Sequence, residues 1–205
     1  MLVPMRAILD AADKNGYAQG AFNVNAVCQV KAAVDVHQIL RSPAIIQGAD
    51  LANGFMGGRT DFANSTLEDK KAGAKNIGAA VKKYAADSDI PVALHLDHGK
   101  NFDSCIAAIE GGYTSVMIDG SSLPFDENVE LTREVVKYAH ERGVTVEGEL
   151  GVLAGVEDHV FAATSTYTNP LSAIDFFKKT GVDALAISYG TMHGANKGCL
   201  LYTSD

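Results

Sequence analysis

The sequence is short of cysteine, of positive charge and of long apolar runs, and each shortage argues against a class of protein. Its three cysteines, Cys28, Cys105 and Cys199, are widely spaced with no Cys-x-x-Cys pair, which predicts reduced thiols and a cytoplasmic location. The net charge of −8 argues against nucleic acid or an anionic membrane as a partner. No apolar run approaches the ~18 residues of a membrane helix, and residues 1–10 lack the apolar core of a signal peptide.

The length and composition are those of one ordinary globular domain. The chain has 205 residues, of which 47% are hydrophobic and 20% charged, enough for a sizeable buried core. Because the net charge is negative, the protein as a whole repels anions. An anionic substrate would therefore need a local, positively charged site to bind it.

Short apolar runs alternate along the chain with longer amphipathic stretches. The runs show little polar alternation, which is typical of parallel strands covered on both faces. They predict strands over residues 18–24, 44–47, 91–96, 115–119, 145–150 and 184–188. The amphipathic stretches predict helices over residues 27–40, 67–86, 102–110, 127–142 and 170–181.

The last predicted helix has clear end signals. Asn169 is the expected N-cap, and Gly181 is the expected end. The large apolar residues between them recur at intervals of three, which predicts that they are buried: Leu171, Ile174 and Phe177.

Two architectures fit such a β–α series, a doubly wound open sheet and a (β/α)₈ barrel. A doubly wound nucleotide binder should carry a Gly-rich phosphate loop after its first strand, but residues 22–25 read Phe-Asn-Val-Asn. Polar residues instead gather at the strand ends, which is the barrel pattern. We therefore predict an incomplete TIM barrel, an α/β fold with about six of eight βα units. The strand-end residues are Asn23, Gln47, Asp97, His98, Asp119 and Glu149, with His193 just beyond the sixth strand.

The strongest local signal is the strand end at residues 95–99, which reads His-Leu-Asp-His-Gly. Alternation along a strand points His95 and Asp97 to the same side, with His98 at the rim. Imidazole beside carboxylate supplies a nitrogen ligand for zinc and an oxygen that orients ligands or moves protons. The alternative is a buried polar cluster that only satisfies itself, but three polar residues in four at the end of an apolar strand favour a site.

Three acids follow on the next two predicted strands. Asp119 fits a site and a helix N-cap equally well. Glu147 and Glu149 are two residues apart and so face the same side, and two carboxylates inside a barrel indicate a cation. The alternative partner is Lys or Arg, and none lies nearby in the sequence.

Two glycine-rich segments complete the pattern. Residues 151–168 predict a long loop with Glu157 and Asp158 near its start, which indicates a mobile lid carrying an acid/base group. Residues 190–198 combine glycines with His193 and Lys197, and such a turn suits a phosphate. Taken alone, this last motif is weak.

Together these motifs resemble those of the class II fructose-bisphosphate aldolases. The family's signatures are His-x-Asp-His-Gly, found at residues 95–99, and Glu-x-Glu-Leu-Gly followed by glycines and an acid, found at residues 147–158. The third is Gly-Thr-x-His-Gly before a Lys, found at residues 190–197. The resemblance runs from about residue 2 to residue 198 and implies a zinc-dependent TIM-barrel enzyme.

The resemblance implies a metal site and a proton-transfer group. His98 and His193 are the implied ligands of the catalytic Zn²⁺. Asp119 and Glu149 are implied to serve a second, inner metal position. Asp97 is the implied acid/base on the hydroxyl next to the bond that breaks.

The resemblance also implies a substrate and the residues that contact it. Glu157 is implied to handle the proton at the carbon of the enediolate, and Asn23 to contact the substrate near the reacting carbons. Gly194 and Lys197 are implied to lie by a phosphate or a monovalent cation. The implied reaction converts fructose 1,6-bisphosphate to dihydroxyacetone phosphate and glyceraldehyde 3-phosphate, in glycolysis or gluconeogenesis, in a homodimer or homotetramer. Because Ala49 stands where many members carry a phosphate-binding Ser, tagatose bisphosphate stays an alternative substrate.

Two other enzyme classes lack their required residues. No predicted strand carries the lysine that a Schiff-base aldolase needs. A zinc hydrolase built on a barrel usually takes a His-x-His pair from its first strand, and residues 23–25 read Asn-Val-Asn.

The chain is predicted to be truncated relative to the family. The family's seventh and eighth strands, and with them the third His ligand of zinc, have no counterpart in this sequence. We predict a partial aldolase domain over residues 1–198 and a tail foreign to the family over residues 199–205. The fragment as given is expected to be inactive, and a non-enzymatic role is the remaining alternative.

Overall fold

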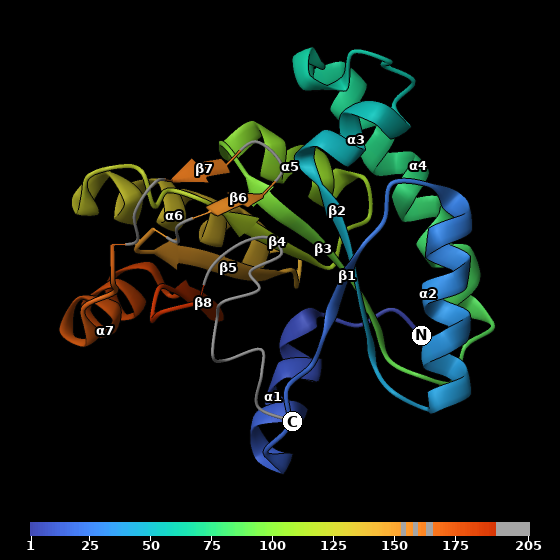
Figure 1. The fold of residues 1–205 in the computed structure, drawn as a ribbon, viewed down its shortest axis with the longest axis horizontal. Helices are drawn as coiled ribbons and strands as arrows, with labels where there is room; N and C mark the ends of the chain where they lie inside the picture. The colour runs from blue at the N-terminus through green and yellow to red at the C-terminus, as the bar shows by residue number, and fades with distance from the viewer. Residues whose placement is uncertain (153–154, 158–159, 163–165, 192–205) are drawn as a thin grey trace.

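Six parallel strands form a curled sheet in this computed structural model, which describes residues 1–152, 155–157, 160–162 and 166–191 (Figure 1). The strands lie in the order β1-β2-β3-β4-β5-β8, and each neighbouring pair is parallel. All six predicted strands are confirmed. Their bounds are β1 Ala21–Asn23, β2 Ala44–Ala49, β3 Val92–Gly99, β4 Ser115–Ile118, β5 Thr145–Leu150 and β8 Ala184–Ile187.

The five predicted helices are confirmed, and the structure adds elements that the sequence analysis missed. The confirmed helices are α2 Val27–Leu40, α4 Leu67–Ala86, α5 Phe102–Glu110, α6 Phe125–His140 and α7 Pro170–Thr180. The additional ones are α1 Met5–Asn15, α3 Asp50–Met56 and the 3-10 turn η1 Phe62–Asn64. No helix in the described part of the chain is long and apolar enough to cross a bilayer.

The segment predicted as a long loop over residues 151–168 contains two short antiparallel strands. Strand β6 (Gly155–Glu157) pairs antiparallel with β7 (Val160–Ala162). Each strand has three residues, which is too few to show a period-2 pattern in the sequence.

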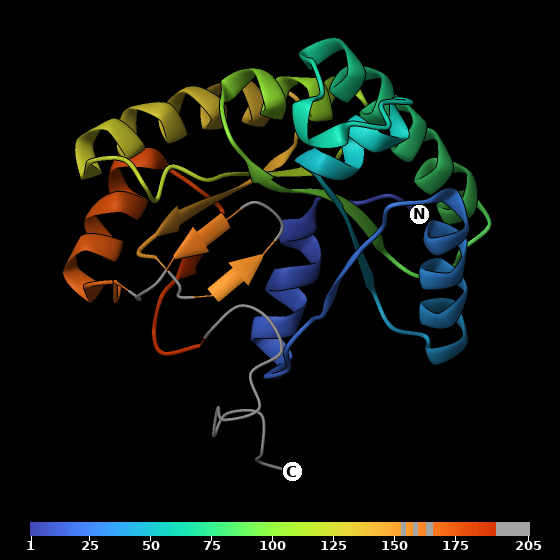
Figure 2. The same cartoon turned by 45° about the horizontal axis from the view of Figure 1, so that its top comes forward.

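The curl of the sheet decides between the two predicted architectures (Figure 2). Helices α2 to α7 follow the convex outer face, whereas a doubly wound sheet carries helices on both faces. Helix α1 lies inside the curve, against the first halves of β2 and β3. The described strands and helices therefore form part of a (β/α)₈ barrel, which confirms the predicted fold class.

Alternation along the strands gives the two faces of the sheet different chemistry. Ile46 and Leu94 point outward into the layer between sheet and helices, and Ile45 and Ala93 point inward against Met5 of α1. Toward the carboxyl ends of the strands, the inward positions become polar. Strand register places these inward polar residues side by side: Gln47, His95, Asp97, Ser115, Glu147 and Glu149.

Helix α7 begins and ends as predicted. The side-chain oxygen of Asn169 accepts hydrogen bonds from the backbone N–H groups of Leu171 and Ser172, at 2.8 and 3.4 Å. Gly181 follows the helix with a left-handed φ of 73°, a conformation that glycine adopts without strain.

The face that α7 turns to the sheet differs from the predicted one. The prediction that Leu171, Ile174 and Phe177 are buried is wrong, because their exposed fractions are 76%, 52% and 55%. Phe176 is fully buried instead, edge-on to Phe125 of α6. One residue turns a helix by about 100°, so burying Phe176 directs its neighbour away from the sheet. The spacing predicted the apolar stripe but could not tell which side of the helix meets the sheet.

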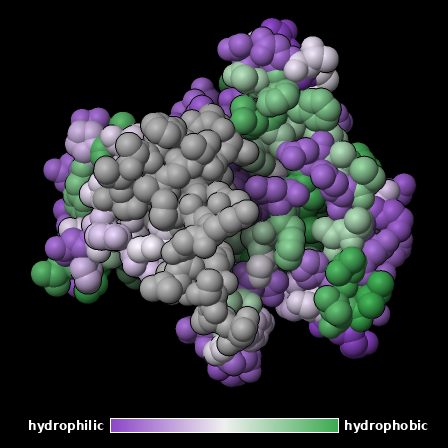
Figure 3. Space-filling view, viewed as in Figure 1, coloured by the Kyte–Doolittle hydropathy of each residue, from purple (hydrophilic) through white to green (hydrophobic). Residues whose placement is uncertain are grey.

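Apolar side chains are also exposed along α2, the helix that connects β1 to β2. They include Val36, Ile39 and Leu40. Figure 3 shows this hydrophobic surface over the end of α2, and another over α3. Among the described residues, β1 and β8 are the outer strands of the sheet, and the helices next to them in the chain, α2 and α7, carry exposed apolar faces.

Two neighbouring phenylalanines test the orientation of α7. Phe176→Ala should lower the free energy of unfolding by about 3–5 kcal/mol, the usual cost of removing a buried aromatic ring. Phe177→Ala is the matched control and should change it by no more than about 0.5 kcal/mol, because that ring is exposed. Urea denaturation followed by circular dichroism measures both, and equal losses would contradict the orientation described above.

Candidate functional site

A bulge at the end of β3 turns His98 toward the neighbouring strands. The register with β4 shifts between Leu96 and Gly99, and His98 has a φ of 48°, a left-handed value uncommon outside glycine. Gly99 permits the close approach to β4, because a Cβ there would lie 2.6 Å from the main-chain oxygen of Met117. Simple alternation would point His98 away from the face that carries Asp97, and the bulge overrides it.

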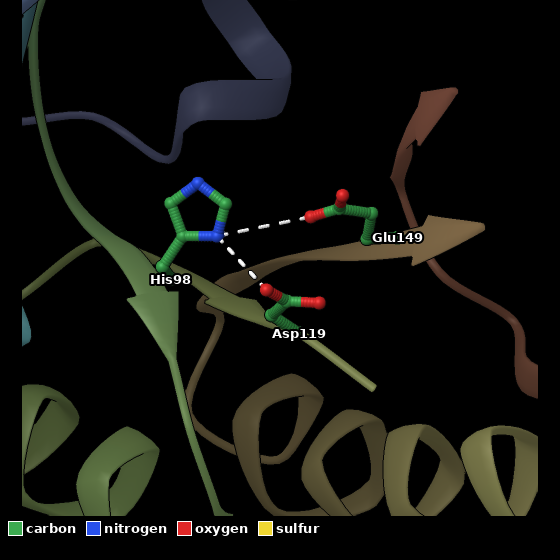
Figure 4. Close-up of side chains that lie close together, drawn as sticks. All are labelled: His98, Asp119 and Glu149. Carbon is green, nitrogen blue, oxygen red and sulfur yellow. Dashed lines mark hydrogen bonds and ion pairs between the residues drawn. The ribbon is translucent and has the colours of Figure 1, made fainter. Parts of the chain in front are cut away.

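Three side chains converge from three neighbouring strands (Figure 4). His98 belongs to β3, Asp119 follows β4 directly, and Glu149 belongs to β5. His98 Nδ1 lies 3.0 Å from Asp119 Oδ2 and 3.8 Å from Glu149 Oε2. One potential ligand atom from each residue lies within 4.8 Å of the other two. The fold thus brings together three of the four residues predicted as metal ligands.

The surroundings of Asp119 keep it ionised. Burial alone would raise the pKa of Asp119, but hydrogen bonds from His98 and Ser121 outweigh this and lower the pKa to about 2. Ser121 donates to Asp119 Oδ1 from its hydroxyl at 2.6 Å and from its backbone N–H at 3.1 Å. Ser121 was not among the residues predicted from the sequence, although its spacing of two from an Asp is the signal of an Asx turn.

Glu149 has the opposite environment. Burial and the nearby negative charge of Asp119 raise the pKa of Glu149 to about 8. Its Oε2 atom is buried and has no hydrogen-bond partner among the described residues. A cation between these carboxylates would give that oxygen a partner and would offset the repulsion.

The residues present therefore fit a divalent metal ion. Imidazole nitrogen and carboxylate oxygen are both ligands that Zn²⁺ accepts, and other divalent metals share this preference. The buried Oε2 atom of Glu149, which has no hydrogen-bond partner among the described residues, is the structural feature that favours a cation here.

A second polar group lies deeper on the inner face of the sheet. His95 Nδ1 is 2.8 Å from Ser115 Oγ, and His95 Nε2 is 3.4 Å from Glu147 Oε2. Burial lowers the pKa of His95 to about 3 and raises that of Glu147 to about 7. The partner of Glu147 is thus a histidine from β3, and the lysine or arginine considered from the sequence is not needed. The pairing escaped prediction because the two residues lie far apart in the chain.

Asp97 lies at the same mouth as the three converging residues. Its side chain is mostly buried, and its negative charge contributes to the raised pKa values of Glu147 and Glu149. Asp97 pairs in register with Ala49, the last residue of β2. A carboxylate in this place can accept or return a proton of a molecule bound at the mouth.

Asn23 lies at the carboxyl end of β1, two strands away from β3. Its side-chain oxygen accepts a hydrogen bond of 2.9 Å from the amide of Gln47 on β2. A cavity of about 360 Å³ lies beside this pair of strand ends. It is lined by Asn25, Leu51, Ala52, Phe55 and Phe62.

The side chain of Glu157 and three further predicted site residues lie outside the part of the chain that the structure describes. The backbone of Glu157 belongs to β6, but its side chain is not among the described ones. His193, Gly194 and Lys197 lie outside the described residues. Their roles stay predictions.

Comparison with known sequences gives the family. The sequence profile of the family described as "Fructose-bisphosphate aldolase class-II" matches residues 3–202. A fructose-bisphosphate aldolase of Treponema pallidum is 48% identical over 200 residues, which cover 96% of this chain and 56% of that protein. A fructose-bisphosphate aldolase of Geobacillus stearothermophilus is 41% identical over 199 residues, which cover 96% of this chain and 64% of that protein.

Solved structures agree with the sequence comparison. The crystal structure of the YdjI aldolase from Escherichia coli K12 superimposes with a TM-score of 0.75 at 30% identity, covering 97% of this chain and 64% of that one. The chain thus spans 56% to 64% of the length of these relatives. Because the family profile matches residues 3–202, nearly the whole of this chain, the chain belongs to the class II fructose-bisphosphate aldolase family.

Proposed function

We propose that the protein catalyses the metal-dependent aldol cleavage of fructose 1,6-bisphosphate to dihydroxyacetone phosphate and glyceraldehyde 3-phosphate, and the reverse condensation. The observation that carries the proposal is the convergence of His98, Asp119 and Glu149, in which a buried oxygen of Glu149 has no hydrogen-bond partner among the described residues, with Asp97 at the same mouth. Membership of the aldolase family supports the reaction class.

Zn²⁺ is the proposed metal. His98, Asp119 and Glu149 would hold it, with His193 as a further ligand. One imidazole and two carboxylates, of which His98 and Glu149 are buried and Asp119 is half-buried, support this donor set. When bound, Zn²⁺ acts as a Lewis acid that stabilises negative charge on substrate oxygens.

Side chains of the protein are proposed to move the protons. Asp97 removes the proton from the hydroxyl next to the bond that breaks, so that this carbon leaves as an aldehyde. The carbon–carbon bond breaks with its electron pair kept by the ketone half. Glu157 then delivers a proton to the carbon that kept the pair. One proton is taken up and one is returned, so no oxidant or reductant is consumed.

The remaining proposed contacts hold the substrate. Asn23 contacts it near the reacting carbons, and the hydrogen bond from Gln47 supports this role by fixing the Asn23 amide. Gly194 and Lys197 bind a phosphate group or a monovalent cation. A local site of this kind would counter the repulsion of the phosphates by a chain whose net charge is −8.

Tagatose 1,6-bisphosphate is the second candidate substrate. The observation behind it is Ala49, which removes the hydroxyl that a Ser at this position would offer to a phosphate. Comparing kcat/KM for the two sugars separates the candidates, since they differ only in the configuration at one carbon. We further propose a cytoplasmic, homo-oligomeric enzyme of glycolysis or gluconeogenesis.

The metal site is tested by direct binding. Glu149→Gln should weaken Zn²⁺ binding by at least about 100-fold, because a neutral amide replaces a charged ligand. The matched control, Glu134→Gln, removes the same charge from the exposed face of α6 and should leave the affinity unchanged. Competition with a chromophoric chelator gives both dissociation constants, and an equal loss in the two variants would rule out a specific site.

The reaction is tested by turnover. In a protein that carries this chain together with the family's remaining strands, fructose 1,6-bisphosphate cleavage should disappear with EDTA and return with Zn²⁺. Asp97→Asn should lower kcat by about 10²–10⁴-fold, the usual contribution of a positioned acid/base group, with little change in Zn²⁺ affinity. A coupled assay of triose phosphate release measures the rates, and full activity in Asp97→Asn would remove Asp97 from the mechanism.

Borohydride separates the metal mechanism from the lysine mechanism. Treatment with borohydride in the presence of substrate should leave the protein unmodified, because no covalent imine forms in the proposed reaction. Mass spectrometry detects any adduct. A trapped adduct on a lysine would replace the proposed mechanism with a Schiff-base one.

A further inference from the structure

A buried amide lies directly behind the three converging residues. Asn128, in the first turn of α6, has an exposed fraction of 1%. Its Nδ2 group donates a hydrogen bond of 2.9 Å to the main-chain oxygen of Glu149. Its Oδ1 atom accepts a hydrogen bond of 3.1 Å from the hydroxyl of Thr132, which is fully buried one turn later. The amide thus ties the end of β5 to the helix that follows β4.

The same amide also fits tightly against the end of β4. Gly120 follows Asp119, and a Cβ at Gly120 would lie 2.3 Å from Asn128 Oδ1. The side chain therefore packs against the backbone next to one candidate ligand and bonds to the backbone of another. Among the described residues, this side chain links the backbones beside Asp119 and Glu149 from outside the sheet.

The burial of the polar side chains of Asn128 and Thr132 on α6 needs an explanation. Most buried residues of α6 are apolar, as expected for a helix that packs on the outer face of a sheet: Val129, Val135, Val136 and Ala139. Asn128 and Thr132 interrupt this surface only where the helix meets the two strand ends. An apolar residue at position 128 would leave the carbonyl of Glu149 without this donor in the interior.

We infer that Asn128, held by Thr132, is a positioning residue that sets the separation of the Asp119 and Glu149 carboxylates and thereby the affinity of the metal site. The inference rests on the proposed function, because it requires a metal at these residues. Groups that orient the ligands of a metal typically change its affinity by about 10–100-fold when they are removed. Asn128 acts through the backbone of a ligand residue and touches no reacting atom.

If Asn128 only stabilised the fold, its removal would lower stability without changing Zn²⁺ affinity. The chain offers a matched control for this alternative. Asn53 of α3 has an exposed fraction of 2%, and its Oδ1 accepts a hydrogen bond of 2.7 Å from the hydroxyl of Tyr113. It is a buried asparagine with a comparable polar contact in another part of the fold. Asn53→Ala and Asn128→Ala remove the same atoms and should both lower the melting temperature of the metal-free protein.

The experiment compares these two variants with the unaltered protein. Zn²⁺ dissociation constants come from chelator competition, and the visible absorption of bound Co²⁺ reports the ligand geometry. We expect Asn128→Ala to weaken Zn²⁺ binding by about 10-fold or more and to shift the Co²⁺ spectrum. We expect Asn53→Ala to leave both unchanged. Unchanged affinity in Asn128→Ala, or an equal loss in Asn53→Ala, would overturn the inference.

A milder variant keeps the test decisive if Asn128→Ala does not fold. Thr132→Val removes only the hydroxyl that holds Asn128 Oδ1, and it should weaken Zn²⁺ binding by roughly threefold, less than removal of the amide itself. Unchanged affinity in that variant would then overturn the inference. If the unaltered protein bound no Zn²⁺, both the proposed function and the inference would fail. If it bound Zn²⁺ and substitution at position 128 left the affinity unchanged, only the inference would fail.

Discussion

The burial of carboxyl groups on the inner face of the sheet is the constraint on which the site depends. Burial raises the pKa values of Glu147 and Glu149 to about 7 and about 8, and the negative charges of Asp97 beside Glu147 and of Asp119 beside Glu149 add to the two shifts. His95 and His98 are the imidazoles that face them. Burying negative charge is costly unless it is neutralised or paired, and one oxygen of Glu149 has no hydrogen-bond partner in the described structure. A divalent cation at this point would relieve both problems, so the crowding of the carboxyl groups favours a metal.

The parallel sheet brings these carboxyl groups close together at one of its edges. Neighbouring parallel strands end at the same edge, so β3, β4 and β5 deliver one residue each although these residues are far apart in the sequence. Regular pleating would point the adjacent residues Asp97 and His98 to opposite sides of the sheet. The bulge at His98 brings both side chains to the same side. Behind the sheet, the amide of Asn128 fixes the ends of β4 and β5 relative to each other. The proposed metal binding at the mouth would thus depend on polar contacts on both sides of the strands.

Sequence patterns indicated a candidate site where chemistry and spacing are local. A histidine, an aspartate and a second histidine at the end of an apolar strand indicated a metal site, and the fold brings His98 together with Asp119 and Glu149. Patterns failed where the decisive partner is distant. The apolar stripe of α7 was assigned to the wrong side, because periodicity describes a helix alone and not the surface that it meets. The supporting role of Asn128 had no signal, since one asparagine in an amphipathic helix looks like any other polar residue.

The sequence by itself determined the order of strands and helices along the chain and the strand ends that carry polar residues, because these follow from short-range periodicity and from residue chemistry. The set of candidate ligands was implied by the resemblance to the aldolase family. Only the tertiary structure decided that the sheet curls with its helices outside, that His95 is the partner of Glu147, and that Phe176 is buried while Phe177 is exposed. Each of these outcomes depends on which surfaces meet across long stretches of chain. Burial and charge pairing are set by those contacts, and a linear pattern does not contain them.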